Sequence, residues 1–154
     1  MRSMEKARVH VQVQEFMTRN FHAIQGDDTC QHAAEQMRRH SIGALPVFGF
    51  DRIVGMITDR DLATGCMAAG HDAGSCAVRQ HMMADPVAIR PEASIEEALS
   101  TMAGEQVRRL IVTDGDQVVG IISLGDLAAR NLWSAEVART LAEISQPIRV
   151  PVPA

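Results

Sequence analysis

The chain has 154 residues, of which 46% are hydrophobic and only 3% aromatic, which is enough for one core or for two small half-domains that share one. Its formal net charge of −4, with Lys and Arg scattered along the chain, argues against binding to a nucleic-acid backbone. The N-terminal residues lack the apolar run of a signal peptide and no stretch approaches the roughly 18 apolar residues of a membrane span, so we expect a cytoplasmic protein that binds neither nucleic acid nor membrane.

The predicted secondary-structure elements occur in the same order twice. In the first copy the apolar stretch HAI precedes a helical pattern over Thr29–His40, and the β-like runs ALPVF and IVGMIT precede a second helix. In the second copy VAI precedes a helical pattern over Ser94–Glu105, and LIVTD and VVGIIS precede another helix. Each copy therefore has the order β-α-β-β-α, which predicts a mixed α/β (α+β) fold.

One more helical pattern follows the second copy and carries apolar side chains on a single face. Its apolar positions, three to four residues apart, are Trp133, Val137, Leu141 and Ile144. Such a face needs another element to cover it. We regard this last helix as a candidate for dimer contact or for reporting a change elsewhere in the protein, in which case its deletion should alter the oligomeric state.

The two copies form an internal repeat. A shift of 65 residues aligns Val13–Ala63 with Val78–Ala128 without a gap. A unit of this size buries too little surface to be stable alone, so we expect the copies to pack face to face. The sequence divides into an N-terminal extension (1–12), a first copy (13–69), a linker (70–77), a second copy (78–130) and a C-terminal helix and tail (131–154).

A repeated phrase is the most specific signal in the two copies: GMITDRDL at Gly55–Leu62 and GIISLGDL at Gly120–Leu127. A hydroxyl residue followed three positions later by Asp is typical of a capping box, which satisfies free backbone N–H groups at a helix start. A glycine within a strand, three residues before the hydroxyl, also indicates that a ligand or another backbone segment comes close at that position. A helix N-terminus suits phosphate, and an Asp carboxylate accepts the hydrogen bonds of a ribose diol. A capping box and a nucleotide site both remain open.

The two copies resemble a tandem pair of cystathionine β-synthase (CBS) domains. The residues that carry the resemblance are HSIGALPVFGFDRIVGMITDRDL and EQVRRLIVTDGDQVVGIISLGDL, introduced by FMTRN and HMMAD. The resemblance implies a stand-alone regulatory sensor and not an enzyme. Its regulatory ligand would be an adenosyl nucleotide such as AMP, ADP, ATP, S-adenosylmethionine or NAD(H), with no required cofactor. It further implies a homodimer that acts on another, unidentified effector protein.

In the CBS family each cleft combines the hydroxyl-Asp motif of one copy with the first strands of the other. The resemblance therefore implies one cleft formed by Ser123, Asp126, Ile42, Gly43, Ala44 and Pro46, with Arg109 at a phosphate position, and a second formed by Thr58, Asp61, Val107, Arg108 and Ile111. The second cleft departs from the family pattern in two ways. It has Ala44 where the first cleft has Arg109, and Ile111 where the first cleft has Pro46. We therefore expect the Asp126 cleft to take a phosphorylated nucleotide and the Asp61 cleft to bind more weakly or to prefer another adenosyl ligand.

Cysteine and histidine alternate at intervals of five residues around the linker, at Cys66, His71, Cys76 and His81. All four are zinc-competent, but structural zinc ligands usually come in closer Cys–Cys and His–His pairs, so we expect no metal site. The three widely spaced cysteines, which include Cys30, also argue against a disulfide framework. Two alternative functions remain: a dimerisation scaffold with vestigial clefts, or a metal- or redox-responsive protein that uses Cys66–His81.

Overall fold

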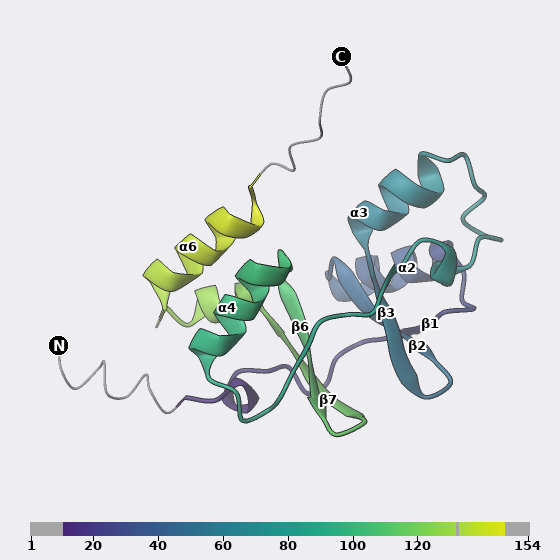
Figure 1. The fold of residues 1–154 in the computed structure, drawn as a ribbon. Helices are drawn as coiled ribbons and strands as arrows, with labels where there is room; N and C mark the ends of the chain where they lie inside the picture. The colour runs from purple at the N-terminus through teal and green to yellow at the C-terminus, as the bar shows by residue number, and fades with distance from the viewer. Residues whose placement is uncertain (1–10, 132, 147–154) are drawn as a thin grey trace, which may run out of the picture. The chain divides into compact units, whose positions relative to one another are not determined.

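The computed structural model describes residues 11–131 and 133–146 (Figure 1). The first copy consists of β1 (Ile24–Gln25), α2 (Cys30–His40), β2 (Ala44–Gly49), β3 (Arg52–Thr58) and α3 (Asp59–Asp61), which continues into the π-helical η2 (Leu62–Met67). The second copy consists of β5 (Ala88–Ile89), α4 (Ile95–Glu105), β6 (Arg109–Asp114), β7 (Gln117–Ser123) and α5 (Leu124–Ala129). The predicted β-α-β-β-α order is confirmed in both copies, and so is the mixed α+β class.

Four further elements lie outside that order: the 3-10 helices η1 (Val13–Glu15) and η3 (Val78–Gln80), the short strand β4 (Met83–Ala84) and the helix α6 (Ser134–Ile144). In the part of the chain that the structure describes, no helix is long and apolar enough to cross a membrane.

The long helix of each copy begins and ends in the same way. Thr29 accepts a hydrogen bond from the backbone N–H of His32 at the start of α2, and Ser94 accepts one from that of Glu97 at the start of α4. Such a side-chain cap satisfies an N–H group that has no partner within the helix. Both helices end on a residue in the left-handed conformation, as is common at helix C-termini.

The strands form two separate sheets. One has the order β1-β2-β3-β4 and the other β5-β6-β7. In the first, β1 pairs parallel to β2, and the β2–β3 hairpin is antiparallel with a register shift at Val47/Phe48. The strand β4 is antiparallel to β3 and places Ala84 opposite Gly55. In the second sheet, β5 pairs parallel to β6. The matching arrangement of β1–β2 and β5–β6 follows from the repeat.

The chain folds into two compact units that do not coincide with the sequence copies. The first-copy unit comprises residues 20–86 and 116–118, and the second-copy unit takes in 11–19, 87–115 and the described residues from 119 onward. The segment with η1 belongs to the second-copy unit, where the Val13 N–H donates to the Ala93 carbonyl at 2.8 Å. In the first-copy unit, the Val78 N–H of η3 donates to the Asp28 carbonyl at 2.8 Å. Each unit is therefore completed by the first residues of the other copy.

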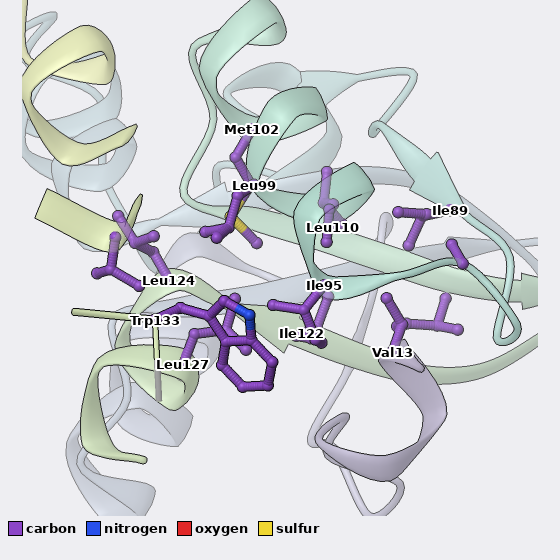
Figure 2. Packing of buried hydrophobic residues seen from close by; sticks show 14 residues of the cluster. Val13, Ile89, Ile95, Leu99, Met102, Leu110, Ile122, Leu124, Leu127 and Trp133 are labelled. Atoms are coloured by element: carbon purple, nitrogen blue, oxygen red, sulfur yellow. The ribbon is translucent and has the colours of Figure 1, made fainter. Parts of the chain in front are cut away.

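The second-copy unit has the larger core (Figure 2). Its buried side chains come from η1, β5, β6, β7, α4, α5 and α6, and include Val13, Ile89, Ile95, Leu99, Met102, Leu110, Ile122, Leu124, Leu127 and Trp133. The core of the first-copy unit is formed by Ile24, Ala33, Met37, Leu45, Val47, Ile57 and Val78. Small and branched aliphatic side chains fill both interiors, as expected from the low aromatic content.

The helix α6 and the preceding Trp133 pack part of their apolar face against their own unit. Trp133 is fully buried, its Nε1–H donates to Glu96 of α4 at 3.0 Å, and its ring meets that of Phe16 edge-on with 5.5 Å between centroids. Val137 is also buried, whereas Leu141 is 42% exposed. Deleting the chain from Trp133 onward would therefore remove part of this core, so that deletion does not isolate a role in assembly.

Candidate functional site

The motif of the first copy lies at the junction of β3 and α3 and forms a capping box. The Thr58 Oγ1 accepts from the Asp61 N–H at 3.1 Å, and the Asp61 Oδ2 accepts from the Thr58 N–H at 2.9 Å. Both side chains are half-buried. The capping interpretation is therefore confirmed for this copy.

The motif of the second copy repeats this geometry between β7 and α5. The Ser123 Oγ accepts from the Asp126 N–H and the Asp126 Oδ2 accepts from the Ser123 N–H, both at 3.0 Å. A carboxylate has two oxygens and about four acceptor positions, and the box uses only one of these oxygens. The box is thus chemically compatible with the acceptance of a further hydrogen bond from a diol.

The glycines that precede the two motifs are explained by another segment of the chain. A Cβ on Gly55 would lie 2.6 Å from the Met82 sulfur and 2.7 Å from the Met83 carbonyl oxygen. A Cβ on Gly120 would lie 2.7 Å from the Met17 sulfur and 3.0 Å from the Thr18 carbonyl oxygen. Of the two reasons predicted for glycine here, the close approach of another backbone is the one observed. These glycines therefore supply no separate evidence for a ligand.

The predicted strand residues lie close to the motif of their own copy. Within the first-copy unit Ala44 is paired opposite Thr58, and the Gly43 carbonyl accepts from the Asp59 N–H at 3.0 Å. In the second-copy unit the Arg108 carbonyl accepts from the Leu124 N–H at 2.8 Å.

The other predicted strand residues are in the same regions. Ile42 precedes β2, Pro46 is buried within it, Val107 precedes β6, and Arg109 and Ile111 are in β6. Each expected cleft takes residues from both units, so the pairing of one copy's motif with the other copy's strands stays a prediction.

A second candidate site lies entirely within the first-copy unit. The thiol sulfurs of Cys30, Cys66 and Cys76 and a ring nitrogen of His81 all lie within 4.8 Å of one another. The three cysteines are buried and His81 is half-buried. The sequence interval Cys66–His81 contains three of these residues, but it omits Cys30, which the fold brings in from the start of α2. Cys30 lies 36 residues before Cys66 and gives no local spacing signal, so only the fold could add it.

Burial raises the pKa of two of these thiols, Cys30 and Cys76. It raises the pKa of Cys30 to about 12, with a further contribution from the neighbouring Cys66 and Cys76. Burial and the neighbouring Cys66 also raise the pKa of Cys76. Without a cation, Cys30 and Cys76 are therefore neutral at pH 7 and fit a compact thiol cluster.

A cavity of about 490 Å³ opens beside the cluster. It lies between α2, η2 and the linker, and its lining includes Cys30, Cys66 and His71 together with Ala34, Met37, Asp59, Leu62, Ala63, Met67, Gly70 and Ala73. Two of the three thiols therefore face a mainly apolar space.

The CBS domain family matches the chain twice, over residues 13–67 and 78–131. The CBS domain-containing protein YhcV of Bacillus subtilis is 37% identical over 133 residues, which cover 86% of this chain and 94% of that protein. The crystal structure of Hypoxic Response Protein I with two coordinated zinc ions is similar with a TM-score of 0.70 and 34% identity, covering 79% of this chain and 98% of that one. A putative signal-transduction protein with CBS domains from Burkholderia ambifaria is similar with a TM-score of 0.72 and 25% identity, covering 91% and 99%. The chain belongs to the CBS domain family and is a tandem CBS pair of a general regulatory class.

Proposed function

We propose that this CBS pair is a ligand sensor that binds an adenosyl nucleotide and changes its conformation or assembly in response. The observation that carries the proposal is the same hydroxyl-Asp box at the strand-to-helix junction of both copies. Each box places a half-buried carboxylate beside a helix N-terminus, where N–H groups and partial positive charge favour an anion. Asp61 and Asp126 accept hydrogen bonds from the ribose hydroxyls, each through the carboxylate oxygen that does not take part in the capping box.

The two copies differ at the position proposed for the phosphate. Arg109 begins β6 and is half-buried, whereas the equivalent position at the start of β2 is Ala44. A guanidinium binds phosphate with a planar pair of donors, which an alanine cannot supply. The cleft that contains Asp126 therefore takes the phosphorylated ligand, and the one that contains Asp61 binds it more weakly or takes another adenosyl compound.

The regulatory step is a shift between conformations. A ligand shifts an equilibrium only by the difference in its affinity for the two states, so it must contact groups that are arranged differently in each. The protein acts as a cytoplasmic homodimer on a separate effector protein and carries out no catalysis. The similarity to a putative signal-transduction protein with CBS domains supports the regulatory role.

Isothermal titration calorimetry with AMP, ATP, S-adenosylmethionine and NADH tests it. Asp61→Asn and Asp126→Asn keep an acceptor for the capping bond but remove the charge, so they separate ligand binding from helix capping. Ser94→Ala is the matched control, because Ser94 caps α4 through the Glu97 N–H and has no proposed role in binding. Binding that weakens in an Asp variant and not in Ser94→Ala supports the proposal. Equal binding in all variants would contradict it.

A further inference from the structure

We propose that Cys30, Cys66, Cys76 and His81 form a structural binding site for a zinc-class divalent ion within the first-copy unit. This inference goes beyond the proposed nucleotide function and does not depend on it. It replaces the expectation from sequence spacing that the chain holds no metal site, because that expectation considered the linker without Cys30.

Three chain segments deliver the four donors. Cys30 is the first residue of α2, Cys66 lies in η2, Cys76 precedes η3 and His81 follows it. Tetrahedral zinc with bonds of about 2.3 Å to sulfur and about 2.0 Å to nitrogen separates neighbouring donors by roughly 3.5–3.8 Å. Since all four donor atoms already lie within 4.8 Å of one another, an ion requires a contraction of only about 1 Å.

Backbone hydrogen bonds hold these segments together independently of an ion. The Cys30 N–H donates to the Cys76 carbonyl at 2.8 Å, and the His71 N–H donates to the Cys66 carbonyl at 3.0 Å. The neighbouring Gln31 N–H donates to the Ala73 carbonyl at 3.0 Å. The helix α2, η2 and the linker are thus tied at the cluster itself, which places the thiols before any ion binds.

A glycine makes room for the histidine and decides which nitrogen faces the thiols. A Cβ on Gly65 of η2 would lie 2.7 Å from the His81 Nδ1, so that edge of the ring lies against η2. The opposite nitrogen, Nε2, lies 3.1 Å from the Cys76 sulfur. A neutral imidazole binds a metal through one nitrogen, and here Nε2 is the one that faces the cluster. The π-helical turn that contains Gly65 and Cys66 is a rare conformation that is frequent at functional sites.

His71 is the nearest competitor for a place in the ligand set. Its Nδ1 lies 3.2 Å from the His81 Nε2 and 3.6 Å from the Cys76 sulfur. His71 is exposed, however, and is not among the donors that lie within 4.8 Å of one another. We therefore assign the ion to Cys30, Cys66, Cys76 and His81, with His71 on the solvent side of the site.

The chemistry of this donor set favours a closed, structural site for a soft or borderline ion. Three thiolates and one imidazole select zinc over magnesium or calcium, which prefer oxygen ligands. A set of four protein ligands leaves no coordination position for a substrate, so the ion stabilises the unit. Binding releases protons from the thiols and cross-links α2, η2 and the linker.

The first experiment uses the wild-type protein. Elemental analysis after purification with zinc should give about one ion per chain, since four protein ligands complete one tetrahedral site. Cobalt(II) titrated into the metal-free protein should produce thiolate-to-cobalt charge-transfer absorption of three-thiolate intensity. Zinc should also protect all three cysteines from alkylation. Absence of the charge-transfer band, together with equal alkylation with and without zinc, would show a plain cluster of packed thiols and overturn the proposal.

Variants then test the ligand set. His81→Ala should weaken zinc binding by at least about tenfold, because even residues that only support a metal ligand are worth 10–100-fold in affinity. His71→Ala should leave the three-thiolate band intact, and His32→Ala is the control for a histidine outside the cluster. Cys30→Ser should reduce the band to two-thiolate intensity. A full three-thiolate band in Cys30→Ser, or binding that needs His71 and not His81, would overturn the assignment.

Discussion

Substitution of Gly55 by alanine tests whether the close approach of β4 to β3 is the reason that a glycine occupies this position. The new Cβ would lie 2.7 Å from the Met83 carbonyl oxygen, and that oxygen belongs to β4, which is paired with β3. The strand would have to move, since a backbone atom cannot rotate away as a side chain can. Overpacking of this kind costs about 1–3 kcal/mol, and the lower chain entropy of alanine returns about 0.4–1 kcal/mol. The mid-range values of these two effects differ by about 1.3 kcal/mol, so we expect Gly55→Ala to lower the free energy of unfolding by about that amount.

Urea unfolding followed by circular dichroism measures this change, and Gly104→Ala is the matched control. Gly104 lies in α4, and a Cβ added there would meet no atom within 4 Å, so alanine should stabilise the protein by about 0.5–1 kcal/mol. The two substitutions are chemically identical and should have opposite signs. A Gly55→Ala protein as stable as the wild type would refute the steric reasoning.

Three other substitutions probe the core, the phosphate position and a titrating histidine. Trp133→Ala should lower the free energy of unfolding by about 3–5 kcal/mol in the same urea assay, whereas a loss below about 1 kcal/mol would contradict the role of this ring in the core. Arg109→Ala should weaken the binding of AMP but not of adenosine in calorimetry, and an equal loss for both ligands would exclude a phosphate contact. Burial, followed by the nearby His22 and Arg39, lowers the pKa of His40. The unfolded chain therefore binds a proton more readily than the folded chain, so stability should fall as the pH decreases through the ordinary histidine range, and less steeply in His40→Gln. Equal pH dependence of the two proteins in thermal unfolding would contradict this.

The order of the elements could be predicted from the sequence because it depends on local patterns. Helix starts at Thr29 and Ser94 are marked by hydroxyl caps, and the strands by short apolar runs between turn residues. The division into compact units could not be predicted in the same way. The 65-residue repeat shows where the copies lie in the sequence. It does not show that the segment with Val13 packs into the second-copy unit.

The candidate sites show the same limit. The hydroxyl-Asp phrase predicted a capping box, which needs only contacts three residues apart, and the structure has it in both copies. The glycine before the phrase predicted a close approach, but the partner of Gly55 is 28 residues away at Met83 and had no local signal. Cys30 is a similar case, because it joins Cys66 and Cys76 only through the packing of α2 against η2 and the linker.

The capping boxes have a structural role of their own, in addition to the proposed role in ligand binding. Ser123 and Asp126 satisfy each other's backbone N–H groups, so the pair caps the helix whether or not a ligand binds. Only a ligand-dependent change at these residues separates a sensor from a scaffold with the same caps.

The most direct test of the sensor function follows the backbone amide signals of the ¹⁵N-labelled protein by NMR as AMP is added. We expect saturable shifts at Ser123–Asp126 and at Arg109, with smaller or later shifts at Thr58–Asp61. Shifts absent from both motifs at saturating AMP, ATP, S-adenosylmethionine and NADH would contradict the sensor function and leave a regulatory CBS scaffold.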